Sequence, residues 1–379
     1  MDVWVKAGHT VEIIRELLPE FTEQTGIDVH LTVVPEDVAY ASLRDGTQRP
    51  DVVTCPFWYL DELVALGVVA PLRLDDVGRK TGDFPATALA ALTRAGQLYA
   101  VPHTLTGGVL SYRADILNSY DISQPRTLDD VIAAANTIRR ALDLRAPLIA
   151  RANPEFSSLE TYAGWAAAKG IQLLPDQGAP DQAALEEGIG DLVAQLRQAP
   201  NSDRLVAADY NILGAEMQAD RAVMMFDTSA WPYLLDSRTS PVAGRMGYTV
   251  ITDITAAQFM YAEGLAVTSW SPHREAAQQF IRWRHSHPVI QAEVDRVGRF
   301  DLPRLDVHES EWFRAAAHEA GANEWLAVIR SAWEHASLDH VPQRTDFVPR
   351  AREIMRAISA TIAGGYPSLS AAHEATYPG

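Results

Sequence analysis

The spacing of hydrophobic residues changes twice near the start of the chain. Val3–Val5 is a short apolar run, and the apolar residues between Val11 and Phe21 recur every three or four positions. Between Val29 and Val33 every second residue is apolar. Short apolar or alternating runs are typical of strands, and a period near 3.6 is typical of an amphipathic helix. This segment is therefore predicted to fold as strand, helix and strand.

Strand and helix patterns continue to alternate along the chain. Asp51–Thr54 is predicted as a buried strand, and strand character returns at Ala222–Phe226 and Gly264–Val267. Helical periods lie between these runs, at about 60–66, 127–142, 159–169 and 181–198, and from Ser271 onward. Strands that alternate with helices favour an α/β fold with mixed, mostly parallel sheets and helices on both faces.

Two local signals refine this prediction. Thr127 is expected to be the N-cap of its helix because Asp130 follows three residues later. The buried stripe of that helix is expected to be Leu128, Val131, Ala135, Ile138 and Leu142. Gly107-Gly108 separates the strand-like runs 99–101 and 109–112, and adjacent glycines there indicate a bend, a close backbone approach or a hinge.

Length and charge limit the classes of function. A chain of 379 residues, 47% of them hydrophobic, is longer than one core usually grows, so two domains are expected. The formal net charge of −17 argues against nucleic acid and anionic membrane surfaces as partners. No apolar run is long enough to span a bilayer, and Met1 leads at once into a predicted strand. The protein is thus either cytoplasmic or exported with a signal that this sequence does not include.

Catalytic and metal-binding signatures are absent from the sequence. There is no phosphate-binding glycine loop, no Gly-x-Ser-x-Gly turn and no His-Glu-x-x-His helix. Cys55 is the single cysteine, and the eleven histidines show no convergent spacing, so neither a metal nor a cofactor is expected. With 49 acidic residues, carboxylate pairs for glycoside hydrolysis remain an open alternative that sequence does not decide.

Aromatic residues gather where strands give way to loops. Phe57-Trp58-Tyr59 follows a predicted strand, Tyr162 and Trp165 begin a helix, and Trp231 follows the strand that ends near Asp227. Loops after the carboxyl ends of strands are where open α/β sheets bind ligands. Aromatic rings beside carboxylates and hydroxyls suit a sugar, which has apolar C–H faces and a polar rim. The alternative for each ring is ordinary core packing.

Seven fragments occur in an order that resembles the family 1 extracellular solute-binding proteins, the maltose-binding-like group of ABC transporters. They are Val3–Val5 with 18–29, Pro50–Val53 with 63–72, Gly96–Pro102, Leu110–Arg113, Arg221–Met225, Glu263–Val267 with 275–281, and 341–372. The resemblance covers nearly the whole chain. Arg113 stands where the family usually has asparagine.

The resemblance implies a two-lobed fold of the type II periplasmic-binding-protein kind, with the ligand held in a cleft at the hinge. The N-terminal lobe is expected at 1–106 plus 260–305, and the C-terminal lobe at 107–259 plus 306–379. It further implies a monomeric, non-enzymatic binding protein that works with the transmembrane permease of an ABC importer. The implied location is periplasmic or extracellular, with a lipid-anchored native form as an alternative.

The resemblance also implies which loops contact the ligand. The residues it assigns to ligand binding are His9, Thr10, Phe57, Trp58, Tyr59, His103, Thr104, Thr106, Glu160, Tyr162, Trp165, Asp227, Ser229, Trp231, Glu263, Gly264 and Arg299. Glu263-Gly264 stands where a glycine pair is common, and Cys55-Pro56 is unusual in the first ligand loop. These departures change the shape of the pocket, so the resemblance does not imply maltose itself as the ligand.

Within this set, different side chains are expected to have different roles. Trp58, Tyr162 and Trp231 are expected to stack on the ligand, and His9, Asp227 and Glu263 to bind its hydroxyls. Arg299 is a candidate for an anionic substituent. A carbohydrate-like ligand is expected; the alternatives are a glycerophosphodiester, a polyamine or an oxyanion. A glycan hydrolase or lyase, or a cytoplasmic interaction protein, is a further alternative.

Overall fold

The computed structural model describes residues 1–8, 10–144, 146–199, 210–228, 231–236, 239–251, 260–338 and 344–377. By its internal packing the chain divides into two compact units. The first unit comprises Met1–Leu105, Tyr261–Asn323 and Arg344–Asp346, and the second comprises Thr106–Met260, Glu324–Gln343 and Phe347–Gly379. The predicted division assigned 306–323 to the C-terminal lobe, whereas this segment packs with the first unit.

The sheet of the first unit has parallel strands at one side and an antiparallel strand within it. β1 (Asp2–Val5) pairs in parallel with both β2 (His30–Val33) and β3 (Val52–Pro56). β10 (Met260–Val267) pairs antiparallel with β3, with Glu263 opposite Pro56. β10 lies between β3 and β6 (Val101–Arg113), which continues into the second unit.

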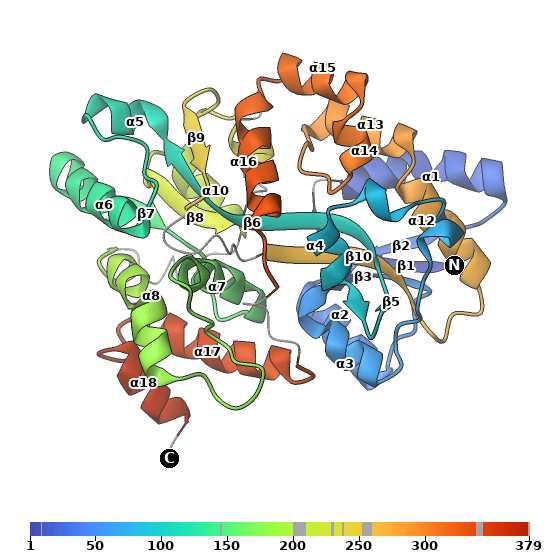
Figure 1. Ribbon diagram of the computed structural model, residues 1–379, viewed down its shortest axis with the longest axis horizontal. Coiled ribbons are helices and arrows are strands. Elements are labelled where there is room, and N and C mark those ends of the chain that lie inside the picture. The colour runs from blue at the N-terminus through green and yellow to red at the C-terminus, as the bar shows by residue number, and fades with distance from the viewer. Residues whose placement is uncertain are drawn as a thin grey trace. The chain divides into compact units, whose positions relative to one another are not determined.

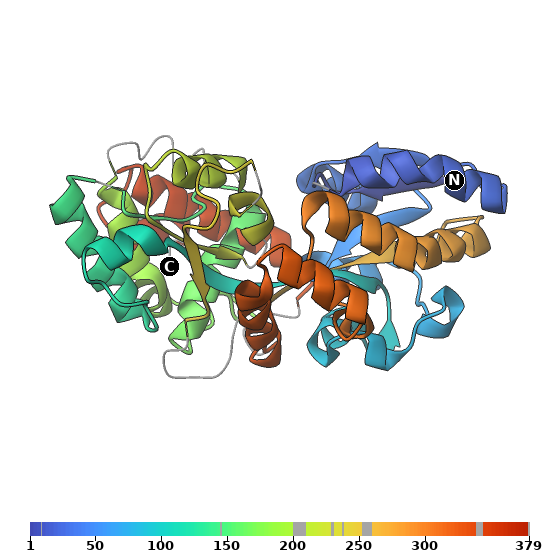
Figure 2. The ribbon, with the colours of Figure 1, turned by 90° about the horizontal axis from the view of Figure 1, so that it is seen from above.

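Helices cover the sheet of the first unit. They are α1 (Val11–Thr25), α2 (Glu36–Asp45), α3 (Leu60–Ala65), α4 (Ala86–Ala91), α12 (Arg274–Arg284), α13 (His287–Val297), α14 (Leu305–His308) and α15 (Glu311–Glu319). α1 runs beside α12 and α13, where Phe21 meets Phe280 edge to face at 6.0 Å (Figures 1 and 2). Apolar residues of α1, α12, β1, β3 and β10 form one core.

The second unit has its own sheet. β6 pairs antiparallel with β8 (Met224–Thr228) and with β9 (Met246–Thr249), and β7 (Leu148–Ile149) pairs in parallel with β8. The helices of this unit are α5 (Ala114–Ser119), α6 (Leu128–Leu142), α7 (Leu159–Ala168), α8 (Gln182–Arg197), α10 (Tyr210–Gln218), α11 (Pro232–Leu235), α16 (Asn323–Glu334), α17 (Phe347–Ile362) and α18 (Leu369–Thr376). α7, α8, α17 and α18 pack against one another (Figure 1).

The α/β class and several local predictions are confirmed. Thr127 caps α6: its hydroxyl accepts a hydrogen bond from the Asp130 amide at 3.0 Å, and the Asp130 carboxylate accepts one from the Thr127 amide at 3.0 Å. Leu128, Val131, Ala135 and Ile138 are buried as expected. Leu142 was wrongly placed in the buried stripe and is 41% exposed, because it lies in the last turn of the helix.

The region around Gly107-Gly108 differs from the prediction of two strands. β6 is one continuous strand of 13 residues through both glycines. A Cβ at Gly108 would make ordinary contacts, 3.4 Å from the Phe226 ring and 3.9 Å from Gly164 Cα, so packing alone does not require this glycine. Among the residues that the structure describes, no helix is both long and apolar enough to cross a membrane.

Candidate functional site

In the second unit, polar side chains converge at one edge of the sheet. β7 and β8 are parallel, so their carboxyl ends meet at the same edge. Arg151 comes two residues after β7, and Asp227 lies near the end of β8. Glu160 lies in the first turn of α7, which begins at Leu159. The carboxyl edge of a sheet of this class is where ligands are usually bound.

The centre of this group is the Arg151 guanidinium, which bridges two carboxylates. Its Nε and Nη2 donate to Asp227 Oδ1 at 2.9 and 2.6 Å, and its Nη2 also donates to Glu160 Oε2 at 2.9 Å. Burial disfavours the charged guanidinium, but the two carboxylates outweigh that cost and raise the pKa of Arg151. The side chain therefore remains a cation in a buried position.

Further donors complete the group. Thr106 Oγ1 donates to Glu160 Oε1 at 3.1 Å, Thr161 Oγ1 donates to Asp227 Oδ1 at 3.1 Å, and Trp231 Nε1 donates to Asp227 Oδ2 at 3.0 Å. We call Thr106, Arg151, Glu160, Thr161, Asp227 and Trp231 the Arg151 cluster. All six are buried, and they come from four separate stretches of the chain.

Tyr162 lies beside this cluster, and Trp165 faces away from it. Tyr162 is fully buried, and its Oη has no hydrogen-bond partner among the described residues. Burial raises the pKa of the Tyr162 phenol, with Arg151 acting in the opposite direction and Asp227 in the same one. Trp165 donates from Nε1 to Asp191 on α8 at 2.9 Å and meets Phe226 edge to face. Its contacts within the unit are those of a packing residue.

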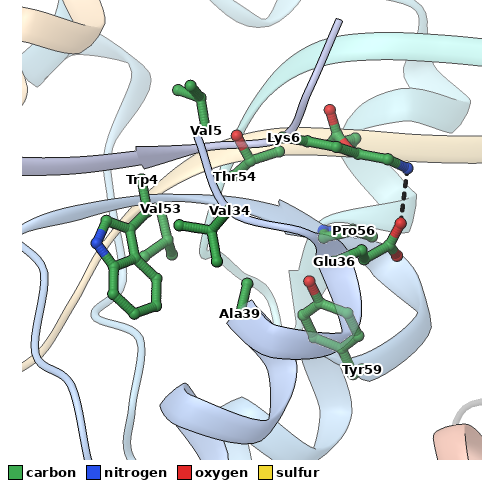
Figure 3. Close-up of a pocket in the computed structure, with 11 residues that line it drawn as sticks. Trp4, Val5, Lys6, Val34, Glu36, Ala39, Val53, Thr54, Pro56 and Tyr59 are labelled. Carbon is green, nitrogen blue, oxygen red and sulfur yellow. Dashed lines mark ion pairs between the residues drawn. The ribbon is translucent and has the colours of Figure 1, made fainter. Parts of the chain in front are cut away.

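The first unit holds a second group of polar side chains, around a pocket at the carboxyl ends of β1, β2 and β3 (Figure 3). The residues that line the pocket are Trp4, Val5, Lys6, Val34, Glu36, Ala39, Val53, Thr54, Pro56, Tyr59 and Glu263. Lys6 directly follows β1, and Glu36 begins α2 after β2. Glu263 is brought to the same edge because β10 runs antiparallel to β3.

Lys6 and two carboxylates define the electrostatics of this pocket. Lys6 Nζ pairs with Glu36 Oε2 at 2.6 Å (Figure 3), and it donates to Tyr261 Oη at 3.4 Å. Tyr261 Oη donates to Glu263 Oε2 at 2.6 Å. Burial raises the pKa of Glu263, and the neighbouring Glu36 acts in the same direction. Lys6 and the hydrogen bond from Tyr261 act in the opposite direction. We call Lys6, Glu36, Tyr261 and Glu263 the Lys6 cluster.

The aromatic residues after β3 pack around this cluster. Phe57 stacks on Trp58 with ring centroids 4.5 Å apart, and both rings contact Tyr261. Tyr59 lines the pocket and packs against Tyr40 at 5.2 Å. The rings of Phe57, Trp58 and Tyr59 are at most 2% exposed.

Arg299 belongs to a separate buried ion network in the first unit. Its guanidinium lies 3.3 Å from Glu293 and 3.7 Å from Asp301, and it donates to the His103 carbonyl at 2.7 Å and to Thr104 Oγ1 at 3.4 Å. Burial, together with Arg284 and Arg299, lowers the pKa of His103 well below its usual value. The Arg299 guanidinium therefore already forms ion pairs with Glu293 and Asp301 inside the first unit.

The remaining predicted residues do not join either cluster. Thr10 is the N-cap residue of α1, but its side chain accepts no capping hydrogen bond. Gly264 lies inside β10, where an added Cβ would meet Ala100 Cβ and the Val101 carbonyl at 2.7 Å. His9 and Ser229 lie outside the described residues. The structure thus brings together Thr106, Glu160, Tyr162, Asp227 and Trp231 in one unit, and Phe57, Trp58, Tyr59 and Glu263 in the other.

Sequence reasoning missed the cations at the centre of both clusters. Arg151 follows the short apolar run 147–150, and Lys6, one of three lysines, follows the first predicted strand. Glu36 follows the second strand in the same way. A charged residue directly after a predicted strand is the signal that could have identified them, because the carboxyl ends of parallel strands share one edge.

The two clusters offer hydrogen-bond acceptors, fixed cations and aromatic rings, which together suit a polar organic ligand. Among the described residues, no group of three or more histidine, cysteine, aspartate or glutamate side chains is arranged to hold a metal ion.

Comparison with known proteins gives one family and one fold. The sequence profile of the bacterial extracellular solute-binding proteins matches residues 7–286. An ABC transporter solute-binding protein from Agrobacterium radiobacter K84, solved with ribitol, superposes with a TM-score of 0.85 at 18% identity, covering 99% of this chain and 96% of that chain. One from Agrobacterium vitis S4, solved with D-mannitol, has a TM-score of 0.83 at 18% identity, with coverages of 99% and 97%.

A third similar structure is maltose-bound MalE3 of T. maritima. Its TM-score is 0.81 at 18% identity, and the match covers 99% of this chain and 97% of that chain. At such low identity the similarity shows a shared fold over nearly the full length of both chains.

Proposed function

Because the chain belongs to the bacterial extracellular solute-binding proteins, we propose that it captures a carbohydrate or carbohydrate-derived solute for an ABC importer. It then delivers this solute to a transmembrane permease without transforming it. The structural relatives named above were solved with two polyols and a disaccharide. A small polyhydroxylated ligand is therefore the class that these comparisons favour.

The observation that carries the proposal is the composition of the two clusters. Each places buried carboxylates and hydroxyls beside aromatic rings at the carboxyl edge of its own sheet. Sugar hydroxyls are donors that such carboxylates accept, and the C–H faces of a sugar ring pack on aromatic faces. Trp58, Tyr162, Asp227, Trp231 and Glu263 remain proposed ligand contacts on these grounds.

The binding mode we propose is closure of two lobes on the ligand. β6 and β10 each have residues in both units, so the chain passes between the units within strands. Short connections of this kind suit a hinge that absorbs a change in backbone angles. A ligand that contacts both units shifts the equilibrium toward the closed form by its differential affinity. The closed, monomeric protein outside the cytoplasm is then the form that the permease recognises.

A binding screen tests the function directly. Thermal unfolding is followed with D-mannitol, ribitol, maltose and common monosaccharides, and hits are titrated by calorimetry. A ligand at about 100 times its dissociation constant stabilises the folded state by roughly 2.7 kcal/mol. Chromatography of the recovered ligand distinguishes binding from turnover: unchanged ligand is expected, and a released product would instead support a glycan-active enzyme.

Small-angle scattering tests closure separately. With a saturating ligand the radius of gyration is expected to fall, since closure makes the molecule more compact. Binding without any change in the scattering curve would leave the function intact and contradict the closure mechanism. If glycerophosphodiesters, polyamines or oxyanions bind and no sugar does, the carbohydrate assignment is wrong and the solute-binding function stands.

A further inference from the structure

The pocket of the first unit contains a carboxylate oxygen for which the described residues provide no donor. Glu36 Oε2 pairs with Lys6, but Glu36 Oε1 has no hydrogen-bond partner among the described residues. The Glu36 side chain is only 8% exposed. A buried carboxylate oxygen without a donor costs free energy that a bound donor would recover.

The direction of this side chain links it to the pocket. Glu36 is one of the lining residues, and its carboxylate lies beside the Lys6 ammonium at the edge where Tyr59 and Pro56 also face the pocket (Figure 3). Glu36 is also the first residue of α2. Its carboxylate thus lines the pocket with one oxygen, Oε1, that lacks a donor among the described residues.

The charges of the pocket do not balance. Of the described residues that line it, Lys6 is the single cation, while Glu36 and Glu263 are both acids. Tyr261 satisfies one oxygen of Glu263 but brings no charge. When both carboxylates are ionised, one more positive charge makes the group neutral, with two cations and two carboxylates. A neutral hydroxyl would fill the open acceptor but leave the excess negative charge.

We propose that this pocket selects sugars that carry a free amino group, whose ammonium donates to Glu36 Oε1 and balances Glu263. The inference rests on the proposed function and specifies the ligand class within it. An ammonium supplies three donors and one charge, and hydrogen bonds to charged groups are stronger than those between neutral ones. The preferred solute is therefore an amino sugar over its hydroxyl or N-acetyl counterpart.

The experiment compares matched ligands on the full-length protein. Calorimetry measures D-glucosamine against D-glucose and N-acetyl-D-glucosamine, and the corresponding β-1,4-linked disaccharides of each, at a pH below the pKa of the sugar amine. The amino form is expected to bind at least about tenfold more tightly than both counterparts. The N-acetyl form keeps the nitrogen and removes its charge, so it separates charge from shape.

Two variants locate the preference. Glu36→Gln keeps the size of the side chain and removes its charge, and should abolish most of the tenfold preference. Glu275→Gln makes the same change at an exposed residue at the start of α12 and should leave the preference intact. Melting curves show whether each variant folds. If Glu36→Gln does not fold, the comparison of ligands on the unmodified protein still tests the preference for the amino form.

Each outcome has a defined meaning. A preference for the amino form that Glu36→Gln removes supports the proposal. Equal or weaker binding of the amino form overturns the proposal and leaves the carbohydrate function standing. A preference that survives Glu36→Gln places its origin elsewhere and overturns the assigned site. If no carbohydrate binds in this set or in the wider screen, the proposed function itself fails, and the inference fails with it.

Discussion

Several buried carboxylates of this protein depend on arginines that lie on other elements or in other loops. Asp227 and Glu160 are held by Arg151, which lies 76 residues from one and nine from the other. Glu293 is shared by Arg284 and Arg299. Removing one partner from such a group leaves a buried charge uncompensated, which costs far more than the group as a whole contributes to stability.

The first residue-scale prediction concerns Arg151. Arg151→Met keeps much of the side-chain volume and leaves Asp227 and Glu160 without their cation. We expect the free energy of unfolding, measured by urea titration, to fall by roughly 3–5 kcal/mol. The control is Arg140→Met at an exposed position on α6, where the change should stay within about 0.5 kcal/mol. Equal effects of the two substitutions would show that the Arg151 cluster does not stabilise the unit.

The second residue-scale prediction concerns how the free energy of unfolding depends on pH. The folded protein holds His103 neutral because burial, Arg284, Arg299 and His285 all lower its pKa. The unfolded chain takes up that proton below about pH 6.5, so it binds more protons than the folded state there. The free energy of unfolding should therefore decrease as the pH falls below about 6.5, by at most about 1.4 kcal/mol per pH unit for this residue.

Urea titrations at several pH values check this. His103→Gln keeps a side-chain acceptor near the two arginines and removes the titration, so its stability should depend less steeply on pH in that range. His318→Gln, at the exposed end of α15, provides a matched control that should keep the original slope. Parallel curves for the protein and His103→Gln would argue against the assigned origin of the pH dependence.

The sequence predicted the surroundings of the aromatic residues better than the pairing of the charged residues near them. Phe57-Trp58-Tyr59 and Trp231 follow strands directly, so their neighbourhood could be inferred from strand order. Arg151 and Glu36 could not be paired with Asp227 and Lys6 in advance, because pairing depends on which strands become neighbours in the sheet. Trp165 shows the same limit, because its hydrogen bond to Asp191 on α8 depends on how α7 and α8 pack.

At the scale of elements, β10 shows how a strand can constrain its own sequence. Gly264 lies opposite Cys55, and a Cβ there would meet Ala100 Cβ and the Val101 carbonyl at 2.7 Å and Leu92 Cδ1 at 2.8 Å. Two of these neighbours are backbone or short side-chain atoms that have little freedom to move. The glycine is thus required by packing within the first unit, whatever contact the ligand makes.

Substitution of this glycine is the element-scale prediction. Gly264→Ala should reduce the free energy of unfolding by roughly 1–3 kcal/mol, the usual cost of overpacking a tightly filled core. Gly82→Ala makes the same change where no atom lies within 4 Å of the added Cβ, and should be nearly neutral. Denaturant titrations of both variants decide it, and a fully stable Gly264→Ala protein would mean that β10 can shift away from Ala100.

Elements with strong local signals were the ones that the sequence predicted well. The cap of α6 depends only on Thr127 and Asp130, which are three residues apart, so local chemistry sufficed. β6 was predicted as two strands because paired glycines usually interrupt a strand. Here both glycines lie within β6, and Gly108 pairs with Thr228 on β8, a partner more than a hundred residues later in the chain.

At the scale of the whole molecule, each unit is assembled from separated segments. The core of the second unit includes α17 and α18, which pack on α7 and α8 although about 180 residues separate α7 from α17. Ten residues of α17 are buried, so much of this helix serves as core. The unit is therefore incomplete without the last stretch of the chain.

A truncated chain tests this dependence. A protein that ends at Asp346 lacks α17 and α18, and its second unit should lose cooperative unfolding, because the apolar surfaces of α7 and α8 become exposed. Circular dichroism melts and binding of a hydrophobic dye follow this. A control that ends at Tyr377 should melt like the full chain. A cooperative melt of the shorter chain at the same temperature would contradict the structural account.

The position of β10 inside the first sheet also determines how late in synthesis the first unit can be completed. The sheet lacks an internal strand until the ribosome has passed Val267, and the second unit waits for the segment that begins at Phe347. Domains usually fold during translation as their segments emerge. Here most of the polypeptide emerges before either unit has all its parts. Neither unit can therefore be completed for most of the synthesis, and an incompletely folded chain is the form that can be threaded through a secretion pore.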